Sequence, residues 1–171
     1  AILEYPNYAF AIGGLGRLEA LKKNYPEAIK LYKKAGTIIP EFSFQEALAE
    51  VYQETGKKEE AAVATKKLIE MLEEDADAGH YVDLEMANIY IQLKKDYDKA
   101  LEYAENEFDK RPENIDVNKT LAHIYYKKND LDKAKEHIKT ATRTNKQEAS
   151  MLCLAGLIFV FSSALSCKYL Q

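Results

Sequence analysis

The chain has 171 residues, of which 47% are hydrophobic and 30% are charged, and it contains only 7 Gly and 4 Pro. Ala, Leu, Lys and Glu dominate and Val is scarce, a composition that favours helices and argues against a sheet protein. The net charge of −4 is small and no block of Lys and Arg occurs, which argues against nucleic-acid binding.

The residues before the first complete repeat predict the end of an earlier one. Ala1 and Pro6 have the same spacing as Ala35 and Pro40, where the alanine belongs to a helix and the proline ends it. We therefore expect residues 1–8 to form the last turn of a preceding repeat. The chain has no initiator Met and no basic-then-apolar leader, so we expect a soluble region of a larger protein, with its compartment unknown and its targeting signal not in this chain.

The next segments predict helix pairs. Residues 9–41 contain two apolar stripes at helical spacing, separated by Asn24-Tyr25-Pro26. The pair Gly13-Gly14 lowers the helix propensity of the first stripe, a cost that the close approach of another helix could offset. Residues 42–79 have a longer second helix over residues 59–73, after which the acidic stretch at residues 73–79 is expected to interrupt the helix as a solvated connection.

Two more pairs follow, over residues 80–114 and 115–147. The first carries one extra residue in its turn, at Leu93–Asp96, and ends at Arg111-Pro112. The second has Leu121, Ala122, Ile124 and Tyr125 on its first helix, and Ala134, Ile138 and Ala141 on its second. A pair this short buries one side of each helix only, so it needs neighbouring copies.

The four segments share a pattern of small and aromatic residues. The small residues Gly16, Ala49, Ala87 and Ala122 are separated by 33, 38 and 35 residues, close to a period of about 34. An aromatic follows the small residue by about three positions in the last three segments, an alanine opens each second helix, and a proline closes two of them.

This pattern resembles the tetratricopeptide-repeat family over nearly the whole chain. The resemblance implies an all-α fold, an α-solenoid of stacked antiparallel helix pairs in a right-handed superhelix. It also implies a protein- or peptide-binding scaffold whose first helices line a concave groove. A chaperone-binding subset of the family clamps a terminal carboxylate, but the corresponding places in the second repeat are acidic, which argues against that subset.

The groove positions that the resemblance implies carry mainly polar side chains. They are Arg17, Leu21, Glu46, Glu50, Gln53, Glu54, Tyr81, Asn88, Gln92, Lys119, His123, Tyr126 and Lys127. Glu46, Glu50 and Glu54 are spaced four apart and form an acidic ridge on one helix face, so we expect a basic partner there. The alternative for all these residues is an ordinary solvated helix surface.

The last segment, residues 148–171, departs from the pattern. Leu154–Phe159 aligns with Leu121–Tyr126, but no polar turn follows, and residues 149–167 carry no charge. We expect a degenerate fifth repeat or an apolar closing helix rather than a membrane span. Its apolar surface predicts either folding back with residues 162–171 or a homodimer, with Leu157, Ile158 and Phe161 as the candidate contacts.

The sequence gives little support for catalysis or for a metal or cofactor site. His80, His123 and His137 lie in different predicted helices, and Cys153 and Cys167 have no zinc-site spacing, so we expect no metal and no cofactor. No catalytic motif is present, and we predict a non-enzyme. Two further functions stay open: a structural module that self-associates through the apolar end, and the regulatory arm of an enzyme or sensor whose active domain is elsewhere.

Overall fold

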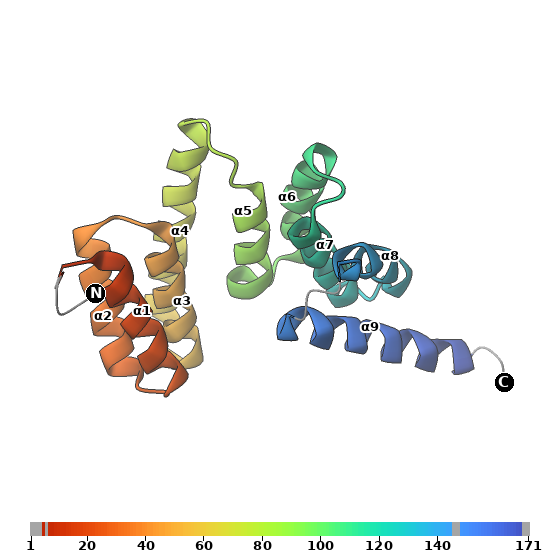
Figure 1. Cartoon of the computed structure of the whole chain (residues 1–171), viewed down its shortest axis with the longest axis horizontal. Helices are drawn as coiled ribbons and strands as arrows, with labels where there is room; N and C mark the ends of the chain where they lie inside the picture. Colours follow the sequence, from red (N-terminus) through yellow and green to blue (C-terminus); the bar gives the residue numbers. More distant parts are fainter. Residues whose placement is uncertain (1–4, 6, 145–147, 169–171) are drawn as a thin grey trace. The chain divides into compact units, whose positions relative to one another are not determined.

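The structure, a computed structural model, describes residues 5, 7–144 and 148–168, and the side chains of the last segment as far as Ser162. The described residues contain helices and no strand (Figure 1). The helices are α1 (Ala9–Leu21), α2 (Tyr25–Ile38), α3 (Phe42–Glu54), α4 (Lys58–Asp77), α5 (Asp83–Ile89) with the π-helix η1 (Tyr90–Lys94), α6 (Tyr97–Lys110), α7 (Ile115–Lys127), α8 (Leu131–Thr142) and α9 (Ala149–Lys168).

Successive helices form pairs: α1 with α2, α3 with α4, α5 with α6, and α7 with α8. The chain divides into two compact units, Ala1–His80 and Tyr81–Gln171, and each unit contains two of these pairs. The boundary between the units falls beside the predicted boundary between the second and third repeats. The predicted fold class, an all-α solenoid of helix pairs, is confirmed.

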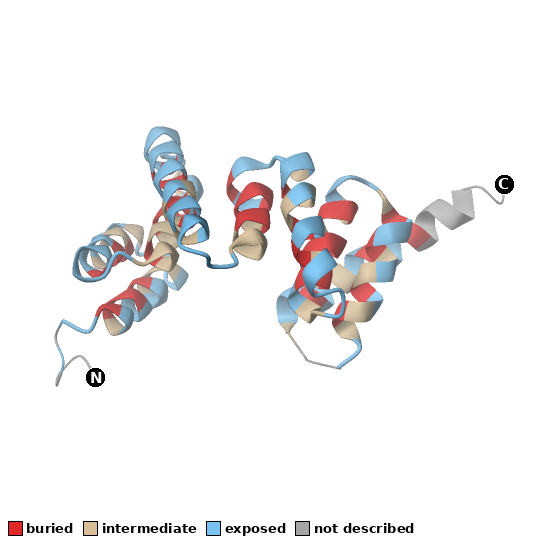
Figure 2. Ribbon diagram, turned by 90° about the horizontal axis from the view of Figure 1, so that it is seen from above, coloured by how far each residue is buried: buried red, intermediate tan, exposed pale blue. Residues whose placement is uncertain are grey.

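Small residues allow the paired helices to approach closely. Ala28, Ala49, Ala87 and Ala122 are fully buried, and together with the other core residues they form the buried stripe along each helix in Figure 2. A Cβ atom added to Gly16 would stand 2.9 Å from the ring of Tyr32. A larger side chain at these positions would therefore push the two helices of a pair apart.

The turn inside a pair is closed by a residue in the left-handed region. Lys23, Gly56 and Asn129 have φ values of 61°, 71° and 62°. In each case the next N–H donates to a carbonyl five residues earlier, namely Asn24 to Glu19, Lys57 to Tyr52, and Asp130 to Tyr125. This bond satisfies a carbonyl at the end of the first helix and starts the reversal of the chain.

The third pair accommodates its extra residue in the helix itself. The last turn of its first helix is the π-helix η1, and Lys95 then adopts a left-handed φ of 57°. The N–H of Asp96 donates to the carbonyl of Tyr90, six residues earlier, at 3.0 Å. The predicted insertion is real, but it widens a helical turn rather than lengthening a loop.

The prediction that the acidic stretch interrupts the second helix of the second repeat is wrong. Helix α4 continues to Asp77, because the alanines of this stretch favour helix and its acidic side chains lie toward the surface. Gly79, with a φ of 91°, ends it, and the N–H of His80 donates to the carbonyl of Asp75 at 3.0 Å.

The final helix α9 packs mainly on α8 and to a lesser extent on α7. Met151, Ile158 and Ser162 form its buried stripe. No helix in the described residues is long and apolar enough to cross a membrane. The predicted turn of a preceding repeat at residues 1–8 lies mostly outside the described residues, and so does the side-chain packing of residues 163–171.

Candidate functional site

The candidate groove residues of the first unit lie on α1 and α3. Arg17 is exposed on α1, and Glu50, Gln53 and Glu54 are exposed on α3, while Glu46 on the same helix is half-buried. Gly13 allows α1 to approach α3 closely, because a Cβ atom at this position would stand 2.4 Å from the ring of Phe44. A close approach of this kind could offset the helix propensity lost at Gly13, whereas a Cβ atom at Gly14 would meet nothing within 4 Å.

The acidic side chains of α3 repel one another. Partial burial and the nearby charge of Glu54 raise the pKa of Glu50, and Arg17 opposes this shift. Glu54 also accepts a hydrogen bond from the hydroxyl of Tyr25, which raises the pKa of that tyrosine. Tyr25 was not among the predicted groove residues, because its position at the start of a second helix gives no groove signal.

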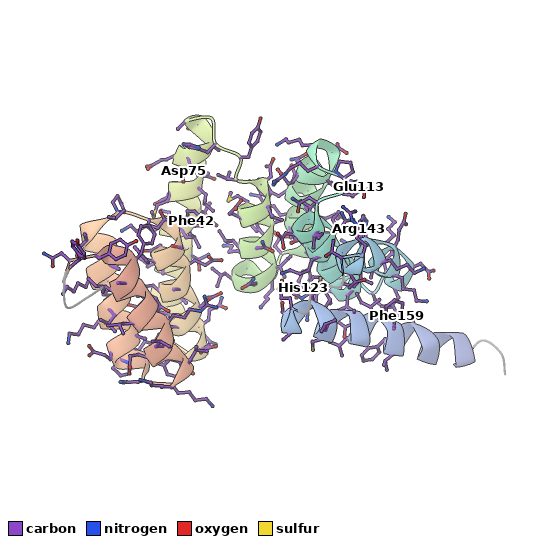
Figure 3. The ribbon with its side chains drawn as sticks, viewed as in Figure 1. Phe42, Asp75, Glu113, His123, Arg143 and Phe159 are labelled. Carbon is purple, nitrogen blue, oxygen red and sulfur yellow. The ribbon has the colours of Figure 1, made fainter. Side chains whose placement is uncertain are left out.

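Four predicted groove residues of the second unit lie along α7. Lys119 and His123 are half-buried, Lys127 is exposed, and all three lie on one side of the helix at a spacing of four residues. Lys119 pairs with Glu148 at 2.8 Å. The ring of Tyr126 lies 6.1 Å, between centroids, from the ring of Phe161 on α9. Figure 3 labels His123 on α7 and Phe159 on α9.

The surroundings of His123 are positively charged. Burial lowers the pKa of His123, and the charges of Lys127, Lys95 and Lys119 lower it further. Sequence reasoning missed Lys95, which follows the π-helix. The extra residue in that turn was the available signal, but the pattern alone does not show that the turn faces α7.

The remaining predicted groove residues have different surroundings. Asn88 is half-buried and accepts a hydrogen bond of 3.2 Å from the hydroxyl of Thr120, so it joins α5 to α7. Gln92 is exposed on η1. Tyr81 is exposed ahead of α5, where Lys110 Nζ lies 5.1 Å from its ring centroid.

The three candidate self-association residues differ in exposure. Leu157 and Phe161 are exposed, at 40% and 49%, whereas Ile158 is fully buried within the chain. Ile158 shares the buried side of α9 with Met151, whereas its neighbour Leu157 points outward. It therefore offers no surface to a second copy, and the outward residues are Leu152, Leu157, Phe159, Val160 and Phe161.

A polar network that joins the half-buried His137 to the buried Asn118 was also missed. The His137 ring stacks on Tyr125, meets Phe108 edge-on, and its Nδ1 lies 2.9 Å from Asn118 Oδ1. Asn118 Nδ2 donates to the carbonyls of Pro112 and Asn114, so its oxygen is the acceptor for His137. The network fixes the α6–α7 connection to α8. No group of three or more His, Cys, Asp or Glu side chains suited to a metal occurs in the described residues.

Comparisons with known proteins support the fold. Residues 92–154 match the family described as "Tetratricopeptide repeat". No curated protein sequence matches the chain. The fold resembles the crystal structure of the APC/C hetero-tetramer Cut9–Hcn1, with a TM-score of 0.64 and 17% identity over 92% of this chain and 31% of that one.

Two further solved structures are similar. One is a tetratricopeptide repeat protein from Parabacteroides merdae, with a TM-score of 0.60 and 14% identity over 95% of this chain and 63% of that one. The other is BtubC (BKLC) from P. vanneervenii, with a TM-score of 0.61 and 19% identity over 95% of this chain and 77% of that one. The chain spans less than two thirds of the first two structures. Identities this low show the fold alone.

Proposed function

We propose that this chain, whose residues 92–154 match the tetratricopeptide-repeat family and whose fold resembles proteins of that family, is a non-catalytic scaffold that binds a protein or peptide on the exposed sides of its first helices. Each unit has exposed charged side chains on its first helices, namely Arg17 on α1 with Glu50 and Glu54 on α3 in one unit, and Lys127 on α7 in the other. Helix pairing buries the small and aromatic residues and leaves these charged side chains exposed. A partner can therefore contact them without disturbing the core.

One observation supports a basic partner for the first unit. Burial raises the pKa of Glu50, the nearby charge of Glu54 raises it further, and Arg17 opposes the shift only in part. A lysine or arginine from a partner would relieve this repulsion and gain charge-assisted hydrogen bonds. The attraction would be screened by salt, because both carboxylates are exposed.

The test is a titration of a fluorescently labelled peptide that alternates Lys or Arg with Leu. Glu50→Lys combined with Glu54→Lys should weaken binding about tenfold or more, and added NaCl should weaken binding to the wild type. Glu59→Lys combined with Glu60→Lys changes two exposed residues of α4 by the same charge and should keep wild-type affinity. Equal loss in both double variants would mean that net charge alone drives binding, against the proposed site.

A second candidate function is self-association through α9, and the outward surface of that helix favours it. Its exposed residues from Leu152 to Phe161 are all uncharged, and five are large and apolar. A second copy of α9 would cover such a surface without opposing like charges. At about 25 cal/mol per Å² of apolar area, a few covered side chains contribute several kcal/mol before entropic costs.

Light scattering over a dilution series tests this second candidate. The wild type should form dimers at high concentration, and Leu157→Glu combined with Phe161→Glu should keep the chain monomeric. The control Lys135→Glu combined with Lys139→Glu changes α8 and should leave the dimer intact. A wild-type chain that stays monomeric at every concentration would contradict self-association through α9.

A further inference from the structure

Cationic side chains gather around His123 in the second unit. Lys119, His123 and Lys127 share one side of α7, and Lys95, the residue after the π-helix, is close enough to His123 for its charge to lower the pKa of that histidine. All three lysines act on His123 strongly enough to lower its pKa, in addition to the effect of its burial. The lysines therefore form one cluster rather than three separate surface charges.

This cluster has more positive than negative charge. Within the described part of the chain, Lys119 pairs with Glu148, whereas Lys95 and Lys127 have no carboxylate partner. Lys127 Nζ instead lies 5.8 Å from the ring centroid of Tyr126. Three lysines against one carboxylate leave an excess of two positive charges.

The contrast with the second histidine of this unit shows that the environment is unusual. The charged neighbours that shift the pKa of His137 include Glu136 and Glu105 as well as Lys133. Those that shift the pKa of His123 are lysines alone. Glu148, the partner of Lys119, therefore neutralises only part of the positive charge beside His123.

An apolar surface borders the cluster. Tyr126, whose ring Lys127 approaches, also contacts Phe161 of α9, and Phe161 is 49% exposed. Ion pairs formed beside an aromatic surface gain from the exclusion of water when an apolar side chain covers that surface. A ligand that is purely charged would leave this aromatic surface uncovered.

We propose that Lys95, Lys119 and Lys127, together with Tyr126 and Phe161, bind an acidic protein segment in which carboxylates alternate with apolar residues. The carboxylates pair with the lysines, and an apolar side chain covers Phe161. The inference rests on the proposed function, since it too places binding on a first helix, but the partner segment has the opposite charge to that expected at Glu50 and Glu54. The two units would then engage segments of different sign.

Fluorescence anisotropy with two synthetic peptides tests the proposal. One peptide alternates Glu with Leu and Phe, and the other has Lys in place of every Glu. We expect Lys95→Glu combined with Lys127→Glu to weaken binding of the acidic peptide about tenfold or more, and Phe161→Ala to weaken it less. The control is Lys67→Glu combined with Lys139→Glu, which gives the same net charge on exposed residues of α4 and α8 and should bind as the wild type does.

The outcomes separate this inference from the proposed function. If the acidic peptide binds no better than the basic one, or if the Lys95 and Lys127 double variant binds it as well as the control does, the inference is wrong. Binding of the basic peptide alone, lost on reversal of Glu50 and Glu54, would leave the proposed function standing without it. A single-stranded oligonucleotide that binds the cluster more tightly than the acidic peptide would also overturn it, in favour of a nucleic-acid partner.

Discussion

The backbone N–H of Asp96 donates a hydrogen bond to the carbonyl oxygen of Tyr90, six residues earlier, at 3.0 Å. The three equivalent bonds in the other turns span five residues, as between Asp130 and Tyr125. The third repeat therefore holds one inserted residue in a π-helical turn, a feature that is frequent at functional sites. In this chain the turn ends at Lys95, one of the three lysines beside His123.

The left-handed residues of the turns give the first prediction. Gly56→Ala should lower the free energy of unfolding by about 1–2 kcal/mol, because an alanine is strained at a φ of 71° although its Cβ meets no other atom. Lys23→Gly, at a φ of 61°, should raise it by about 1 kcal/mol for the same reason. Urea unfolding measures both, and a stabilising Gly56→Ala would show that the turn is not left-handed in solution.

The adjacent glycines of α1 should respond in opposite directions. Gly13→Ala should destabilise the chain by about 1–3 kcal/mol, because its Cβ would stand 2.4 Å from a carbon of the packed Phe44 ring. Gly14→Ala should stabilise it by about 0.5–1 kcal/mol, since that Cβ meets nothing and alanine favours helix. The two variants serve as matched controls for each other in thermal unfolding. Equal effects would contradict the close contact of α1 with α3.

Periodicity predicted the helix pairs because small and aromatic residues recur wherever two helices touch. The same pattern located the extra residue near Leu93, but it did not predict the π-helix. Spacing alone does not distinguish an insertion that lengthens a loop from one that widens a helical turn. It also missed the buried Glu107, since a glutamate normally marks an exposed helix position. Glu107 forms ion pairs with Lys110 and Arg111, which lie one helical turn further along the chain. A pattern of apolar residues does not reveal such partners.

The candidate site was only partly predictable. The groove positions on α3 and α7 follow from the repeat register, and their role in binding stays a prediction. The proximity of Lys95 to His123 depends on how the third pair packs against the fourth, and so does the meeting of Asn118 with His137 across two helices. Contacts between helices depend on packing geometry, which spacing within one helix does not fix.

The buried alanines of the second unit provide a test of the repeat register. Ala100 and Ala134 have no exposed surface, and each opens the second helix of its pair. Ala100→Arg or Ala134→Arg should therefore cost about 2–4 kcal/mol, because a long charged side chain is forced into a close helix contact. Ala62→Arg, at an exposed position of α4, is the control and should melt as the wild type does. Unchanged melting of both buried variants would contradict the register.

Acid should weaken the second unit through His137. Burial lowers the pKa of His137 below the ordinary value of 6.5, a direction that Lys133 reinforces and Glu136 and Glu105 oppose. The unfolded chain therefore binds the proton more readily, so this stability is present above about pH 6.5 and is lost as the pH falls toward the folded pKa. His137→Gln should lessen the difference in unfolding free energy between about pH 7.5 and about pH 5.5. The exposed His80→Gln is the control, and an identical pH dependence in all three proteins would contradict this role.

Chemical-shift mapping of the isotope-labelled chain during titration with the basic peptide tests the central claim most directly. If the peptide binds on the exposed sides of the first helices, the largest backbone shifts should fall on α3 around Glu50 and on α1 around Arg17. The second helices α2 and α4 should change little except at Tyr25, which donates to Glu54. Shifts concentrated on the outward side of α4, around Val63 and Lys67, or no shifts at saturating peptide, would contradict a first-helix binding face.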